Sequence, residues 1–127
     1  MSLWTFKQFV RGDKKPIKAW YDELPNEAQA KFDVVLEQLR DTPNTDWSAS
    51  LVKRLTGYRG IYEIRLRVKN VLYRPLGFFG PNPYEFTLLV PAREKGNEFE
   101  PKNAPKIAIK RKKLVQENKG FADECDF

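Results

Sequence analysis

The spacing of apolar residues changes near residue 60, and this change most limits the folds open to the chain. Before that point, apolar side chains recur every three or four positions, as on one face of a helix. From Ile61 onward they recur at every second position, as on one face of a strand. We therefore expect helices first, a sheet afterwards, and an α+β fold in which helices cover the sheet.

The first 50 residues predict a short strand and two helices. Residues 3–10 alternate well enough for the strand, and Asp13 can cap a helix that has Pro16 in its first turn. A second helix is expected over residues 25–41, with an apolar stripe formed by Phe32, Val35, Leu36 and Leu39. The short connection between the two helices predicts an antiparallel helical hairpin.

The second half predicts a small antiparallel sheet and a last helix. Strands are expected at 61–68, 71–79 and 84–90, and a polar segment then leads into a helix at 102–118. Because three strands in sequence form a meander, one face of the sheet should lie under helices while the other faces solvent.

The bulk properties predict one domain spanning residues 1–127, since 127 residues can bury a core of their own. The sequence has no apolar run of membrane-spanning length and no signal-peptide pattern, so we expect a cytoplasmic protein with no membrane partner. A short acidic tail, about 120–127, carries the single cysteine, Cys125, which we expect to be exposed and unpaired.

The charge is distributed unevenly along the chain. Residues 1–50 hold seven Lys or Arg against eight Asp or Glu, whereas residues 51–119 hold sixteen against six. A basic half of this kind favours a polyanionic partner, either nucleic acid or an acidic protein, although surface charge also serves solubility alone.

Two arginines are expected to face each other across the first hairpin. If Lys69-Asn70 is a two-residue turn, Arg65 lies directly opposite Arg74. Directly opposed like charges cost about 0.2 to 1 kcal/mol, so a negative group should lie between them. Glu63, on the same face, is one candidate, and a bound phosphate, which guanidinium groups hold well, is the other.

An ordered series of short motifs extends through the second half. It consists of Leu55, Gly60-Ile61-Tyr62-Glu63-Ile64-Arg65, Tyr73-Arg74, Phe86-Thr87-Leu88-Leu89, Lys95, and Pro101 with Ala108. In this order and spacing, the segment from Leu55 to Lys113 resembles the RelE/HigB superfamily of bacterial toxin endoribonucleases, in particular its phage-related HigB-like branch. The resemblance implies a RelE-like fold, with an N-terminal helical hairpin packed on a small, mainly antiparallel twisted sheet and a C-terminal helix.

The resemblance also implies a function, that of a type II toxin that cuts messenger RNA on the ribosome and is inhibited by a cognate antitoxin. In the implied reaction the RNA 2′-hydroxyl attacks the adjacent phosphorus, with no metal or cofactor, and cations stabilise the phosphoryl oxygens. Arg65 and Arg74 match the strand arginines of the family and would bind the scissile phosphate, and Lys95 would contact it or act as a base. Glu63 and Tyr58 are further acid or base candidates, and the sequence offers no histidine for that role.

The chain departs from the family after the last core strand. Many relatives carry H-G-F-x-K-K there, whereas this chain reads LVPAREKGNEFEPK and keeps only Lys95 of that motif. A second hypothesis therefore stays open, in which the protein is a non-catalytic, phage-encoded module that binds RNA or a protein on the same fold.

Eight further basic residues are expected to contact RNA. They are Lys53, Arg54 and Arg59 before the sheet, Arg67 on the arginine face, and Lys110, Arg111, Lys112 and Lys113 on the last helix. The last four could instead contact an acidic antitoxin, and a solvated loop or helix face explains both groups without any partner. The sequence predicts no oligomeric state.

Overall fold

The computed structural model describes residues 2–127 and has the expected α+β architecture. The helices are α1 (Pro16–Glu23), α2 (Asn26–Arg40) and α3 (Ala104–Glu117), with short 3₁₀ turns η1 (Asn44–Asp46) and η2 (Lys119–Phe121). The strands are β1 (Thr5–Phe9), β2 (Val52–Arg54), β3 (Tyr62–Ile64), β4 (Leu66–Val68), β5 (Val71–Tyr73), β6 (Leu76–Phe79), β7 (Glu85–Val90), β8 (Arg93–Lys95), β9 (Glu98–Glu100) and β10 (Ala122–Glu124).

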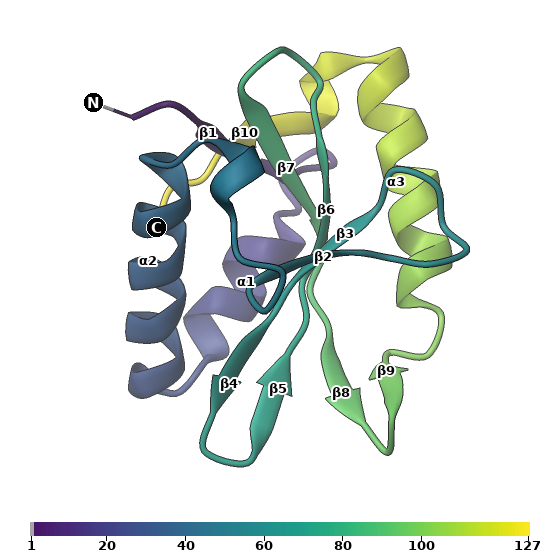
Figure 1. Ribbon diagram of the computed structural model, residues 1–127. Coiled ribbons are helices and arrows are strands. Elements are labelled where there is room, and N and C mark those ends of the chain that lie inside the picture. The colour runs from purple at the N-terminus through teal and green to yellow at the C-terminus, as the bar shows by residue number, and fades with distance from the viewer. Residues whose placement is uncertain (1) are drawn as a thin grey trace.

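Six of these strands form the main sheet, in the order β10-β1-β7-β6-β3-β2. Strand β1 lies in its interior, parallel to β7 and antiparallel to β10, so segments from the two ends of the chain are neighbours (Figure 1). The remaining four strands form a second sheet in the order β4-β5-β8-β9. The main sheet is therefore mainly antiparallel, as expected, but the predicted meander of consecutive strands forms only part of it.

Both faces of the main sheet are covered, which corrects the expectation of an open face. Helices α1 and α2 lie against one face and α3 against the other (Figure 1). The first core includes Phe6, Phe32, Ile64 and Phe86, and the second includes Ile61, Leu76, Phe78 and Leu89. Helix α3 packs on the second core with small residues, Ala104 and Ala108, which bring it close to the strands.

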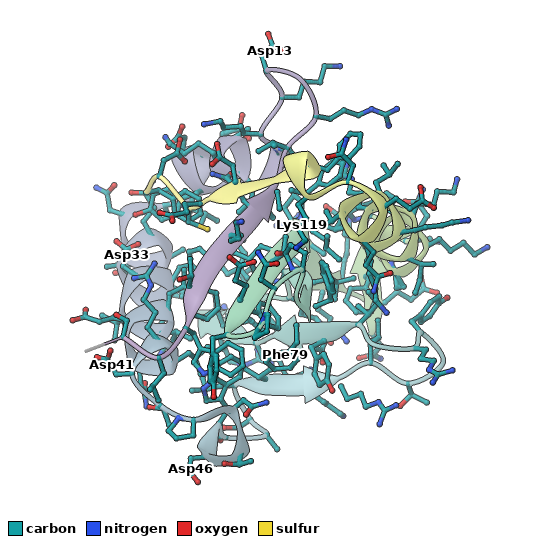
Figure 2. The ribbon with its side chains drawn as sticks, turned by 90° about the horizontal axis from the view of Figure 1, so that it is seen from above. Asp13, Asp33, Asp41, Asp46, Phe79 and Lys119 are labelled. Carbon is teal, nitrogen blue, oxygen red and sulfur yellow. The ribbon has the colours of Figure 1, made fainter. Side chains whose placement is uncertain are left out.

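The helical hairpin forms as the sequence predicts, apart from its cap. The predicted stripe of α2 is buried, and the ring of Trp20 on α1 lies edge-on to that of Phe32, with the ring centroids 5.4 Å apart. Asp13 does not cap α1, since Lys15 occupies the N-cap position and no side chain within residues 2–127 caps the helix. Arg11 and Lys14 instead pair through their backbones, and Asp13 lies at the tip of the projecting loop (Figure 2).

The predicted register of the first hairpin is confirmed, with Leu66 opposite Tyr73 and Val68 opposite Val71. The positive φ of its turn falls on Lys69, at 55°, although Asn tolerates that conformation better than Lys.

The polar segment that precedes the last helix forms a second hairpin, β8–β9. Its two-residue turn is Gly96-Asn97, with φ values of 59° and 65°, a combination typical of tight hairpins. Figure 1 shows that both hairpins extend from the same end of the molecule.

The acidic tail is part of the fold rather than an exposed extension. Strand β10 pairs with β1, and the ring of Phe127 stacks on that of Tyr21, with centroids 4.5 Å apart. Cys125 is half-buried against the first core, and burial raises the pKa of its thiol to about 12. The expectation of an exposed thiol is therefore wrong.

Candidate nucleic-acid interface

Arg65 and Arg74 lie where the chain passes from one sheet to the other. Arg65 separates β3 from β4, and Arg74 with Pro75 separates β5 from β6. The pairs Glu63–Leu76 in the main sheet and Leu66–Tyr73 in the second sheet share one register, which places Arg65 opposite Arg74 between them. The two backbones turn aside at this point, because Arg65 N–H donates to Leu51 and Arg74 N–H to Ala92. The predicted convergence of the two arginines is therefore present.

The carboxylate of Glu63 lies between the two guanidinium groups. Arg65 Nη1 donates to Oε1 of Glu63 at 2.9 Å, and Arg74 Nε donates to Oε2 at 2.7 Å. Only 2% of the Glu63 side chain is exposed. Both oxygens of a buried carboxylate thus receive charge-assisted hydrogen bonds, which offset the cost of removing the charge from water. Of the two candidates for the bridging anion, Glu63 occupies the position.

The β8–β9 hairpin closes over Arg74. Glu94 accepts a long hydrogen bond from Arg74 Nη1 at 3.5 Å, and the guanidinium carbon lies 3.8 Å from the centre of the Phe99 ring. Glu94 and Phe99 are directly opposed on β8 and β9, so both side chains face the arginine. The Arg74 side chain is 12% exposed as a result, which contradicts the expectation that it faces open solvent.

Arg65 remains the more accessible of the two arginines, with 29% of its side chain exposed. Within residues 2–127 its guanidinium donates to Glu63 alone, through one of its three nitrogens. A guanidinium carries five N–H donors, so donors are left over for an external acceptor. Lys53, on the edge strand β2, lies opposite Glu63 and therefore on the same face. Arg65 and Lys53 together offer cationic groups to solvent at this edge.

Lys95 does not join this cluster. Neighbouring side chains on a strand point to opposite faces, and Glu94 faces Arg74. Lys95 accordingly shares the other face of the hairpin with Arg93, where both form ion pairs with Glu100, at 3.4 and 3.1 Å. The expected grouping of Lys95 with the two arginines is therefore wrong.

Lys53 and Arg54, which were expected to precede the sheet, lie on its edge strand β2. Arg54 and Arg59 border a second feature, a hollow of about 450 Å³. It is lined by residues 54–59, which include Arg54, Tyr58 and Arg59. Arg54 and Arg59 are exposed and Tyr58 is half-buried. Lys112 of α3 donates to the backbone oxygen of Arg59 at 3.2 Å, which ties this loop to the helix. Arg67 is exposed on the β4–β5 hairpin.

The basic run of α3 divides into structural and solvent-facing residues. Arg111 donates to the backbone oxygen of Leu89 at 2.8 Å and stacks over the ring of Phe9, at 4.9 Å. Burial, together with the nearby charge of Arg11, lowers its pKa from the ordinary arginine value. Lys110 and Lys113 are exposed. Two of the four residues expected to contact RNA, Arg111 and Lys112, therefore make contacts within the fold.

Sequence reasoning missed Glu94 and Phe99, although a signal for them was available. Gly-Asn is among the strongest two-residue turn signals, and it would have indicated a hairpin whose residues pair across it. Among the described residues, no group of His, Cys, Asp and Glu side chains is arranged to hold a metal ion. No helix within residues 2–127 has both the length and the apolar character required to cross a bilayer.

Comparison with known proteins adds one positive finding. Searches of curated proteins and of solved structures gave no match. A family model described as "Phage derived protein Gp49-like (DUF891)" matches residues 19–113, from within α1 to near the end of α3. This match includes the helical hairpin, both arginines and the β8–β9 hairpin, well over half of the chain. The chain therefore belongs to the Gp49-like family of phage-derived proteins, a family of the general RelE/HigB-like toxin type.

Proposed function

We propose that this protein is the toxin of a toxin–antitoxin pair, that it cleaves messenger RNA on the ribosome, and that a cognate antitoxin inhibits it. Membership of a toxin-like family supports the class of protein. The observation that carries the proposal is the geometry of Arg65. One nitrogen of its guanidinium group donates to Glu63, and the other N–H donors of that group stay free to bind a phosphate.

The arrangement gives the residues distinct roles in this proposal. Arg65 contacts the scissile phosphate and stabilises the charge that builds up on its oxygens when the 2′-hydroxyl attacks. Glu63 and Arg74 are positioning residues, because Glu63 is buried and Arg74 is held by Glu63, Glu94 and Phe99. Lys53 and the cations of the 54–59 loop follow the RNA backbone on either side.

The site offers few side chains that could accept or donate the protons of the reaction. The attacking hydroxyl must lose a proton and the departing 5′ oxygen must gain one. Glu63 is saturated by arginines, and the chain contains no histidine. We assign this task to Tyr58, which lines the hollow of residues 54–59 beside Arg54 and Arg59. We therefore expect slow cleavage by the isolated protein and faster cleavage when ribosomal groups complete the site.

A second function is favoured by the same pairing of Glu63 with both arginines. If Glu63 merely neutralises them, the protein is a binding module that grips RNA with Lys53, Arg54 and Arg59 without cutting it. The two functions share a surface, and they differ in whether Arg65 binds the scissile phosphate and in whether a phosphodiester bond is broken.

The test is controlled expression in bacteria, with mapping of RNA 5′ ends, for the wild type and two variants. Arg65→Gln removes the proposed phosphate ligand. Arg93→Gln is the matched control, because Arg93 is also ion-paired to a glutamate but lies on the far face of the β8–β9 hairpin. We expect growth arrest and new 5′ ends with the wild type and Arg93→Gln, and neither with Arg65→Gln.

The folded state of each variant is checked by thermal unfolding. Soluble wild-type protein that causes no new 5′ ends, yet binds RNA through Lys53 and Arg54, would replace the nuclease with the binding module. Cleavage that persists in Arg65→Gln would refute the role of Arg65.

A further inference from the structure

A groove of about 480 Å³ lies between the start of α1 and the middle of α3. Its lining comes from three segments, the end of β1 with the following loop, the first turn of α1, and the middle of α3. The loop is the one that projects with Asp13 at its tip (Figure 2). The residues of the candidate site, Glu63, Arg65, Arg74, Glu94 and Phe99, do not line the groove, so the groove is a separate feature of the surface.

The rim of the groove is strongly basic. Its charged residues are Arg11, Lys14, Lys15, Lys110 and Arg111, and no carboxylate is among the lining residues. Lys15 is ion-paired, to Asp126 at 2.9 Å, whereas Arg11, Lys14 and Lys110 form no ion pair within residues 2–127. Crowded cations of this kind repel one another, and an anionic occupant would relieve that repulsion.

The floor of the groove is apolar. It is formed by Phe9, Pro16, Ala19, Ile107 and Leu114. Ile107 and Leu114 are half-buried: both pack against the second core and also line the groove. They lie seven residues apart, which is about two helical turns, so they form one apolar strip along α3.

These two properties together select the kind of occupant. Single-stranded nucleic acid would need aromatic rings on which bases can stack, and the one ring of the lining, Phe9, is 3% exposed and covered by Arg111. An aliphatic floor suits Leu, Ile or Val side chains, while a basic rim suits Asp or Glu. An amphipathic protein segment can present both at helical spacing.

We propose that this groove binds an acidic amphipathic segment of a partner protein, with aliphatic side chains on Ile107 and Leu114 and carboxylates against Arg11, Lys14 and Lys110. The inference does not depend on RNA cleavage. Under the proposed function, the antitoxin is the partner that would supply this segment.

The test is a selection from a displayed library of random peptides of about 16 residues, roughly four helical turns. The folded wild-type protein is the target, and the affinity of enriched peptides is then measured by fluorescence anisotropy. We expect peptides that carry several Asp or Glu together with Leu or Ile at positions three or four apart.

Three variants locate the binding site. Arg11→Glu with Lys14→Glu, both on the exposed loop, should weaken peptide binding about tenfold or more, and Ile107→Ser should also weaken it. Lys53→Glu with Arg54→Glu makes the same charge change on the other basic surface and should leave the affinity unchanged.

The proposal is overturned if the enriched peptides are not acidic, if the Lys53→Glu, Arg54→Glu control weakens binding as much as the loop variant, or if Ile107→Ser has no effect. It is also overturned if an RNA oligonucleotide displaces the peptides from the wild type and the control alike, since nucleic acid would then be the better occupant. Because these measurements use no nuclease assay, the proposed function can fail without affecting them.

Discussion

Replacing the buried Glu63 by Gln should destabilise the protein more than the removal of any single surface or half-buried charge. The substitution keeps the size and shape of the side chain but removes the negative charge between Arg65 and Arg74. The two guanidinium groups would then face each other across an amide that accepts at one atom only. Among the described residues, Glu94, 3.5 Å from Arg74, would be the carboxylate still ion-paired with either arginine.

The expected magnitude follows from the burial of the three side chains. Removing one partner of a buried ion pair costs about 3 to 5 kcal/mol. Glu63 and Arg74 are buried enough for that range, at 2% and 12% exposed, but Arg65 is 29% exposed and water can compensate part of its loss. We therefore expect a loss of about 2 to 4 kcal/mol in the free energy of unfolding.

The assay is urea unfolding followed by tryptophan fluorescence, with Glu94→Gln as the matched control. Glu94 makes a single long contact with the same arginine and is 31% exposed, so its replacement should cost less than about 1 kcal/mol. If Glu63→Gln costs no more than Glu94→Gln, the carboxylate does not hold the two arginines and the proposed role of Glu63 is refuted.

Three further predictions concern the rest of the fold. Gly77→Ala should lower the free energy of unfolding by about 1 to 3 kcal/mol, because an added Cβ would lie 2.5 Å from the backbone oxygen of Thr87; urea unfolding with no measurable loss would contradict this. Lys69→Gly should raise the melting temperature, since glycine adopts the positive φ of that turn without strain, and an unchanged or lower melting temperature would count against it. Hydrogen bonds from Lys15 and Gln8 lower the pKa of Asp126, so the packing of the C-terminal tail should persist in mild acid and weaken only as the pH falls through that lowered value. Asp126→Asn should speed thiol labelling of Cys125 at constant pH. Equal labelling rates for the variant and the wild type would refute the link.

The sequence alone determined the parts of the protein that depend on neighbouring residues. The stripe of α2 follows from helical periodicity, and the register of the first hairpin follows from a two-residue turn. That register brought Arg65 opposite Arg74, and the charge repulsion between them correctly required a negative group. Local spacing and charge were sufficient here because the interacting residues lie close to one another in the sequence.

The tertiary structure decided what depends on distant segments. Whether Glu63 or an external anion bridges the arginines, and whether Arg74 is open to solvent, depends on the β8–β9 hairpin folding back over the cluster. The position of β1 between β7 and β10, and the covering of the second face by α3, bring together segments far apart in the sequence. The alternation of apolar and polar residues indicates which face of a strand is apolar. It does not indicate which strand will pair with its edges or which element will cover the apolar face. Those choices are made by the packing of the whole chain, and they leave Arg65 partly exposed while they bury Arg74.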